Sequence, residues 1–524
     1  ESRGILNSRV AMTRGRSFQF AKFRLQPAQA GGDNMMKHQF VFGFVWSVMI
    51  QSLFGATFKV SSAEEIEALM KSEKLSEGDT IIWADGDYAD EELKLDKVHG
   101  SEGKPIILKA ETPGGVILRG ESRFSFGVKW WVIEGFHFDG SDGKANSYNA
   151  VEFRGSKNIG AEHVRLTNCA MTNLVTEESS SKWVLLYGKS NTIDHCYFTG
   201  KKSRGALLTV ELAYLENGVE AGHRIAWNHF ADFSFQKGTD NEVIRLGNSE
   251  DQHRPARCLI ERNYFYGCDG ENEIISNKSS FNTYRSNTFR KCNGALVLRH
   301  GHHARVEGNY FFGDGAKDAG GIRVSDSHHV IVNNHLQDLT GTTWNAAFSI
   351  LGGKKRSGDT SSGYQSVDGI TVAHNSIIHC ERSIFLNKAK GSRAPSGVIA
   401  NNLIVSDKVP LVVEELSSDK LTWSGNLFYG GEVKAAIMAL NSDPRLKMVD
   451  GIRIPDSAGP VANAAAKIPI SIETDIEGQK RPNEGADVGA NEVKGGEGEI
   501  SLLPLEPNDV GVNFLKVQKR AGRD

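Results

Sequence analysis

Asn263-Tyr264-Phe265, Asn287-Thr288-Phe289 and Asn309-Tyr310-Phe311 repeat one short phrase, in which an asparagine is followed two positions later by an aromatic residue. The three phrases begin 24 and 22 residues apart. Related phrases, with an aromatic or aliphatic third residue, begin at Asn228, Asn334, Asn375, Asn402 and Asn426. A near-regular interval of roughly 20–30 residues is typical of a solenoid, in which each repeat forms one coil.

The coils are predicted to consist of strands. Short β-branched or aromatic runs alternate with Gly, Asn and Asp turns, and no long helical period appears between Thr80 and Phe428. One asparagine per coil can form a ladder of side-chain amides along the axis, while stacked Phe, Tyr and Ile fill the interior. We therefore expect an all-β, single-domain, right-handed parallel β-helix. The wider interval from Asn334 to Asn375 contains the polar stretch 352–363, which indicates a loop insertion.

An N-terminal helix is expected to cap the open end of the solenoid. Ser62-Ala63-Glu64-Glu65 is a capping-box signal that opens a helix extending to about Lys71. The apolar residues of this helix share one face, and they are Ile66, Leu69 and Met70. The first strand is predicted to follow the helix, within 78–83.

The ends of the chain divide it into four segments. Residues 1–34 are interpreted as a non-native or upstream extension, and 35–56 as a signal peptide with an apolar stretch from Phe40 to Ile50. That stretch is too short for stable membrane insertion, so a secreted or periplasmic location is expected. The β-helix is assigned to 57–492 and a C-terminal tail to 493–524.

Charge and cysteine spacing exclude some classes. A net charge of −3 does not suit a nucleic-acid-binding protein, so a polyanion would have to bind at a local positive cleft. The six cysteines show no Cys-x-x-Cys spacing, which argues against zinc. Cys268 and Cys292 occupy equivalent positions on adjacent repeats, where they would form either a disulfide or a pair of stacked buried thiols. The oligomeric state is not determined by these patterns.

The chemistry is concentrated in the segment from Glu271 to Lys278 and in Arg299. Glu271 and Glu273 alternate along a predicted strand and therefore share a face, which suits a cation site. Lys278 and Arg299 are separated by about one coil, which would place them on neighbouring strands. A cation beside two basic side chains suits proton abstraction next to a carboxylate, as in lyases that act on uronic acid polymers.

Several motifs together resemble polysaccharide lyase family 6, which includes alginate lyases and the dermatan sulfate-cleaving chondroitinase B. They are the segments 271–278, 293–301, 306–311 and 321–324, with closing segments at 475–478 and 487–490. The resemblance implies that Lys278 is the Brønsted base and Arg299 the Brønsted acid. A second role for Arg299, electrostatic stabilisation, stays open because a guanidinium rarely gives up a proton.

The resemblance also implies a calcium site and substrate contacts. Calcium would be bound by Asn241, Glu271 and Glu273, although a shift of one residue would replace Asn241 by Asp240 or Glu242. The residues expected to face substrate are Arg323, Arg245, His300 and Tyr284, with Tyr284 or water as an alternative proton donor. For His300, a structural role is the alternative. His302 and His303 are interpreted as surface residues rather than metal ligands, because no third histidine or acid follows at ligand spacing.

The sequence thus predicts a lyase that cleaves alginate by calcium-assisted β-elimination and leaves unsaturated uronate ends. A chondroitinase B-like lyase acting on dermatan sulfate and a non-catalytic glycan-binding β-helix are the alternatives. A polygalacturonase-type hydrolase is disfavoured, because the chain has no Asp-Asp pair of the kind expected there.

Overall fold

The computed structural model describes residues 55–515 except 144, 147–148, 177–181, 235–239, 355–362, 434–436, 438 and 494–500. The predicted extension at 1–34 and nearly all of the predicted signal peptide at 35–56 lie outside the described residues. In the part that the structure describes, no helix is long and apolar enough to span a membrane.

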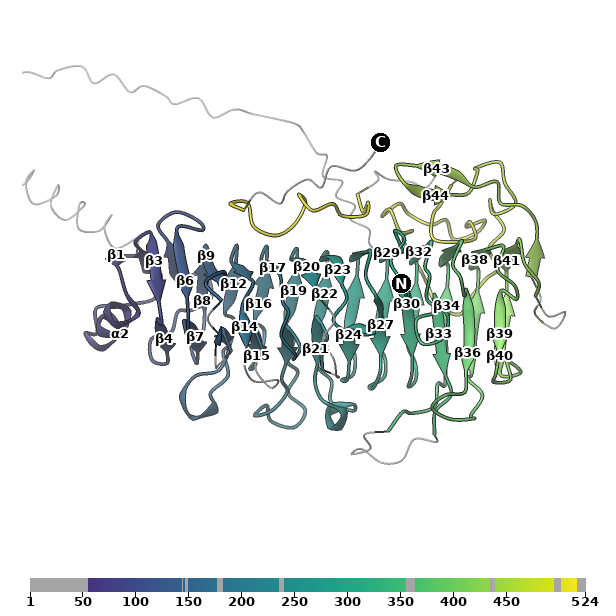
Figure 1. Cartoon of the computed structure of the whole chain (residues 1–524). Coiled ribbons are helices and arrows are strands. Elements are labelled where there is room, and N and C mark those ends of the chain that lie inside the picture. The colour runs from purple at the N-terminus through teal and green to yellow at the C-terminus, as the bar shows by residue number, and fades with distance from the viewer. Residues whose placement is uncertain are drawn as a thin grey trace, which may run out of the picture. The chain divides into compact units, whose positions relative to one another are not determined.

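Three long parallel sheets run side by side along one axis, as Figure 1 shows, and each complete coil contributes a strand to each sheet in turn. Sheet 1 contains β1 (Thr57–Val60), β2 (Thr80–Trp83), β5 (Ile106–Ala110), β8 (Trp131–Glu134), β12 (Arg165–Thr167), β16 (Thr192–Asp194), β19 (Arg224–Ala226), β22 (Leu259–Glu261), β25 (Thr283–Arg285), β28 (Arg305–Glu307), β31 (Val330–Val332), β34 (Ile370–Ala373), β37 (Gly397–Ala400) and β40 (Leu421–Ser424).

Sheet 2 contains β3 (Gly86–Ala89), β6 (Val116–Arg119), β9 (Phe136–Asp139), β13 (Ala170–Thr172), β17 (Tyr197–Thr199), β20 (His229–Phe233), β23 (Tyr264–Cys268), β26 (Thr288–Arg290), β29 (Tyr310–Phe312), β32 (His335–Gln337), β35 (Ser376–Ile378), β38 (Leu403–Val405), β41 (Asn426–Tyr429) and β42 (Ala439–Asn441).

Sheet 3 carries the candidate site. It contains β4 (Glu92–Leu95), β7 (Arg123–Phe126), β11 (Val151–Glu152), β15 (Val184–Leu186), β18 (Leu208–Val210), β21 (Ile244–Leu246), β24 (Glu273–Asn277), β27 (Gly294–Leu298), β30 (Ala319–Val324), β33 (Phe348–Leu351), β36 (Ile384–Asn387) and β39 (Val412–Glu414). Outside the three sheets lie the pairs β10 (Ala145–Asn146) with β14 (Val175–Thr176) and β43 (Lys447–Val449) with β44 (Ile452–Ile454), and the 3₁₀ turns η1 (Ser156–Asn158) and η2 (Ser249–Asp251). The predicted right-handed parallel β-helix is confirmed.

The capping helix α2 (Ala63–Lys71) lies where the capping box predicts it. The Ser62 hydroxyl accepts a hydrogen bond from the Glu65 backbone N–H, and Ile66 and Met70 pack into the core. The prediction that the first strand follows the helix is wrong, because β1 precedes α2 and pairs with β2 in parallel register. The short β1 run at 57–60 lies next to the assigned signal peptide, and the sequence pattern does not distinguish it from that segment.

The asparagine ladder is confirmed along the repeat. Each Nδ2 donates to the Oδ1 of the next asparagine at 2.9–3.0 Å, through Asn228, Asn263, Asn287, Asn309, Asn334, Asn375, Asn402 and Asn426. Beside the ladder, five phenylalanines stack with ring centroids 4.6–5.1 Å apart, and they are Phe198, Phe230, Phe265, Phe289 and Phe311. Cys268 and Cys292 are buried free thiols, which confirms the interpretation as stacked thiols, and no disulfide joins them.

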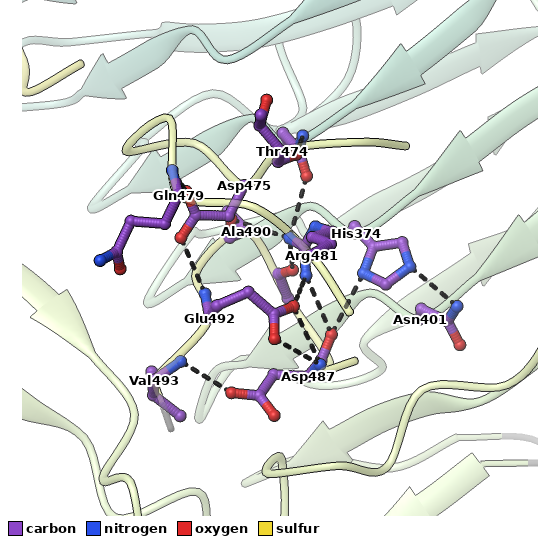
Figure 2. Close-up of polar contacts among 12 residues, drawn as sticks. His374, Asn401, Thr474, Asp475, Gln479, Arg481, Asp487, Ala490, Glu492 and Val493 are labelled. Carbon is purple, nitrogen blue, oxygen red and sulfur yellow. Dashed lines mark hydrogen bonds and ion pairs between the residues drawn. The ribbon is translucent and has the colours of Figure 1, made fainter. Parts of the chain in front are cut away.

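A buried polar network fastens the segment 474–493 to the solenoid, as Figure 2 shows. The Arg481 guanidinium pairs with Glu492 and donates to the Asn333 side chain at 3.0 Å and the Gly489 carbonyl at 2.8 Å. His374, also drawn in Figure 2, bridges the Asp487 carbonyl at 3.1 Å and the Asn401 amide at 3.0 Å. Because Arg481 is almost completely buried, this closing segment belongs to the folded domain.

Part of the assigned tail packs along sheet 2. The Leu502 carbonyl accepts from the Tyr310 hydroxyl at 3.1 Å, and the Leu505 N–H donates to the Thr288 hydroxyl at 2.9 Å. Leu505 and Val510 form a small apolar cluster with Tyr264. The described tail therefore crosses several successive coils (Figure 1).

Candidate active site

Lys278 and Arg299 directly follow two neighbouring strands of sheet 3. Their strands β24 and β27 pair with Asn277 opposite Leu298, so the two basic residues leave the sheet on adjacent coils. The Lys278 side chain is 9% exposed and that of Arg299 is 35% exposed. The Lys278 Nζ atom lies 3.2 Å from Glu242 Oε1.

A β-bulge in β24 sets the orientation of Glu273. The register shifts between Glu273 and Ile275, and both Ile274 and Ile275 lie in the core, which breaks the simple alternation of the strand. Glu273 and Ser276 consequently share one face, where the Ser276 hydroxyl donates to Glu273 Oε2 at 2.6 Å. Bulges commonly re-aim side chains next to active sites.

Glu273 is the centre of a group of cationic side chains. Its Oε1 atom lies 3.1 Å from Arg299 Nη1 and 3.4 Å from Arg323 Nη1. Burial by itself would raise the pKa of this carboxyl, but Arg299 and Arg323 hold the pKa below its ordinary value. Glu273 is therefore an anion that joins two arginines from different coils.

Glu271 has the opposite electrostatic character. Burial raises its pKa to about 8, and the neighbouring carboxylates of Glu242 and Glu273 add to the effect. Its Oε1 accepts from the Asn241 backbone N–H at 3.3 Å, while Asn241 Oδ1 accepts from the Gly205 N–H at 3.2 Å. Close carboxylates that oppose one another's ionisation mark a place where a cation would be stabilised.

The donor set around Glu271 fits a hard cation. Carboxylate and amide oxygens are the ligands that calcium prefers, and buried Glu242 Oε2 has no hydrogen-bond partner in the described part of the chain. Among the described residues, however, no group of three His, Cys, Asp or Glu side chains is already arranged around one point.

The chondroitinase B family model matches residues 60–443, which is well over half of the chain. The chain belongs to the chondroitinase B family. The resemblance to polysaccharide lyase family 6 is confirmed by solved structures. The alginate lyase AlyGC of that family is 28% identical, with a TM-score of 0.74 over 88% of this chain and 59% of AlyGC. This chain therefore spans about three fifths of AlyGC.

Two further structures of polysaccharide lyase family 6 are similar. A mannuronic acid-specific enzyme from human gut microbiota is 26% identical, with a TM-score of 0.64 over 73% of this chain and 87% of that one. A lyase from Pseudopedobacter saltans is 20% identical, with a TM-score of 0.59 over 83% of this chain and 99% of that one, and shares the fold. No curated protein sequence matches the chain.

Two arginines assigned to substrate in this chondroitinase B-like chain are held mainly by protein groups. Arg245 lies 3.5 Å from Glu211 and 3.7 Å from Asp240, with its side chain 11% exposed. Arg323 is 2% exposed and donates to the Trp344 carbonyl and to Asn345 Oδ1, each at 2.9 Å. Arg323 thus lies beneath the surface, where it contacts Glu273 and the loop around 344, and its assignment to substrate remains a prediction.

Tyr284 requires correction. Its side chain is fully buried in the solenoid core, and its hydroxyl donates to Asn277 Oδ1 at 2.7 Å. It occupies the middle position of β25, whose neighbours Thr283 and Arg285 face outward. A residue in the interior of the coil cannot bind substrate or protonate a leaving group.

His300 lies beside aromatic and basic residues that no sequence motif indicates. Burial lowers its pKa to about 4, with further lowering from Arg299 and Lys278, so the imidazole is neutral at pH 7. Its ring lies 5.4 Å from that of Tyr364, which also lies 5.6 Å from the Arg299 guanidinium. Lys390 stands 5.0 Å from Tyr364 and 5.3 Å from Trp344. These residues come from loops between coils, where the repeat pattern carries no positional information.

Proposed function

We propose that this chain is a polysaccharide lyase that cleaves alginate by calcium-assisted β-elimination. The observation that carries the proposal is the position of Lys278 and Arg299 on adjacent coils beside the carboxylates of Glu242, Glu271 and Glu273. Strands of a parallel sheet are about 4.8 Å apart, so two basic groups on adjacent coils can flank a single sugar linkage. The identity to family 6 alginate lyases supports alginate as the polymer.

Calcium would be held by Glu271 and Asn241 together with Glu273 or Glu242. When bound, the ion offsets the negative charge of the substrate carboxylate, so that removing the neighbouring proton no longer builds an uncompensated second charge. The arginines beside Glu273 supply fixed positive charge to the same region.

Proton transfer is assigned to the chain's own residues. The unprotonated Lys278 amine takes the proton from C5 of the uronate, and the C5 electron pair forms a C4–C5 double bond as the C4–O bond breaks. The leaving oxygen then receives a proton from Arg299 or from water. Where water supplies the proton, Arg299 stabilises the developing charge, a role that suits a guanidinium because this group rarely gives up a proton. Lys278 must first separate from Glu242, to which it is paired at 3.2 Å.

A panel of polymers tests this proposal directly. Poly-mannuronate, poly-guluronate, mixed alginate, dermatan sulfate and pectate are each incubated with the full chain and calcium, and the ultraviolet absorbance of the unsaturated uronate is followed. We expect absorbance to rise with the alginates. A rise with dermatan sulfate alone would make the chain a chondroitinase, and no rise with any polymer would leave a glycan-binding β-helix.

Export is part of the same proposal. An enzyme for a large polysaccharide needs to meet its substrate outside the cytoplasm, and the sequence at 35–56 has the pattern of a signal peptide. Cleavage near residue 56 of the protein recovered from the medium or periplasm, mapped by N-terminal sequencing, is the expected result.

A further inference from the structure

Four histidines lie close together in the connections through which the chain passes from sheet 3 to sheet 1. His253 lies in the β21–β22 connection, His302 and His303 in the β27–β28 connection, and His328 in the β30–β31 connection. Phe281, from the intervening β24–β25 connection, packs against the central two, with its ring 5.3 Å from that of His302 and 4.8 Å from that of His303. His303 and His328 are exposed, and His253 and His302 are half-buried.

The central pair points its ring nitrogens at one another. The Nδ1 atoms of His302 and His303 are 2.7 Å apart. At this separation one nitrogen carries a proton and the other presents its lone pair, so the two rings share one hydrogen bond. The ring of His328 lies 4.8 Å from that of His303, and the ring of His253 lies 6.0 Å from that of His302.

We propose that His302 and His303 form the core of a binding site for a borderline transition-metal ion such as Zn²⁺ or Ni²⁺. Both rings can present an Nδ1 lone pair to one ion once the shared proton is replaced by a proton on Nε2. Zinc–nitrogen bonds are about 2.0–2.1 Å, which places two tetrahedral ligands about 3.3 Å apart. The pair therefore needs to open by only about half an ångström from its present separation.

A third ligand is available by side-chain rotation. His328 is exposed and adjacent to His303, and His253 is adjacent to His302, so either can turn toward an ion held by the pair. No trio of ligands is preassembled among the described residues. The ion would accordingly first be bound by two imidazoles and water. A third imidazole would replace a water when the side chain of His328 or His253 turns toward the ion.

The ligand chemistry separates this site from the proposed calcium site. Imidazole nitrogen suits zinc, nickel and copper, whereas calcium takes oxygen ligands. The histidine site contains no carboxylate among the four side chains that define it. Calcium should therefore not displace zinc, and a variant of the carboxylate cluster should keep zinc binding.

Calorimetric titration of the full untagged chain with zinc chloride, after removal of bound metal with a chelator, tests the proposal. His303→Asn and His302→Gln are the variants, because asparagine tolerates the φ of 57° at position 303. His379→Asn is the matched control, since His379 is another exposed histidine with a φ of 53° on a different turn.

We expect one saturable zinc equivalent in the wild-type chain, together with a zinc-induced rise in melting temperature. Both should be lost in His303→Asn and in His302→Gln, and both kept in His379→Asn and in Glu271→Gln. Zinc binding that persists unchanged in either folded histidine variant would overturn the proposal. So would the absence of saturable binding in the wild-type chain, or an equal loss in the His379 control. The melting curves of the metal-free variants show directly that each is folded, and either histidine variant alone decides the outcome.

Discussion

The Nζ atom of Lys278 lies 3.2 Å from Oε1 of Glu242, in an ion pair whose side chains are 9% and 2% exposed. The pair ties the candidate base to the same carboxylate cluster that contains Glu271 and Glu273. A charge in such a position costs free energy unless its partner stays in place. Glu242 therefore positions Lys278 in the resting protein, a role that neither residue shows when it is considered alone.

Replacing Lys278 with Ala should lower turnover on alginate by at least about a hundredfold, the usual contribution of a positioned proton-transfer group. Polymer binding should change far less, because Lys278 is paired with Glu242 in the resting protein and so contributes little net attraction to the polymer. Initial rates from unsaturated-uronate absorbance give kcat and KM, and calorimetry gives binding to the inactive variant. Near-normal turnover in Lys278→Ala would end its assignment as the base, and His300 would then be the next candidate.

Replacing Arg299 with Lys separates its two proposed roles. The variant keeps a positive charge near Glu273 but loses the planar guanidinium, so we expect partial activity if Arg299 stabilises charge. A loss as deep as that of Lys278→Ala would instead assign proton donation to the guanidinium. Arg299→Ala serves as the reference, because it removes both the charge and the donor. The measurement is the ratio of kcat values among the three proteins.

Glu271 should make metal-free stability depend on pH. Its folded-state pKa of about 8 lies above the unfolded value of about 4.3, so the native state binds the proton more tightly and loses stability as pH rises between these values. Glu271→Gln should reduce the fall in melting temperature between pH 5 and pH 9. Calcium should raise the melting temperature of the wild-type chain at pH 9 but not that of the variant. An equal calcium effect on both proteins would place the ion elsewhere.

Interrupting the asparagine ladder should lower the free energy of unfolding. Asn309 donates to the Tyr284 carbonyl and to Asn334, and accepts from Asn287. Asn309→Ala leaves buried donors and acceptors unpaired, and should lower the free energy of unfolding by at least about 2 kcal/mol. Urea denaturation measures this change. Asn441→Ala, at an exposed position of β42, should stay within about 0.5 kcal/mol of the wild-type protein.

Buried His329 should weaken the fold in acid. Its Nδ1 accepts from the Ala304 N–H at 3.0 Å and its Nε2 donates to the Ser325 carbonyl at 2.9 Å, an arrangement that only the neutral ring satisfies. Burial lowers its pKa to about 4, below the unfolded value of about 6.5, so its contribution is complete above pH 6.5 and is lost as pH falls toward 4. His329→Gln should flatten the decline in melting temperature between pH 7 and pH 5. The exposed control His379→Gln should leave that decline unchanged.

Much of the architecture could be predicted because a solenoid repeats local rules. The side-chain amide of each ladder asparagine donates to the asparagine of the next coil. The phrases from Asn228 to Asn426 therefore specify both the direction in which coils stack and the register of neighbouring strands. The capping helix followed from a local signal at Ser62 and Glu65. The sequence pattern does not predict strand β1, because its four residues contain no repeat phrase and follow the segment that is assigned as a signal peptide.

The sequence by itself determined the coil, the ladder and the chemical character of the segment from Glu271 to Lys278, because these depend on residue types at fixed spacing. Only the tertiary structure decided which side chains meet across coils and which are covered. It paired Lys278 with Glu242, buried Arg323 beneath Trp344 and enclosed Tyr284 in the core. The physical reason is that a bulge and loops of irregular length set these contacts, and neither obeys the period of the repeat.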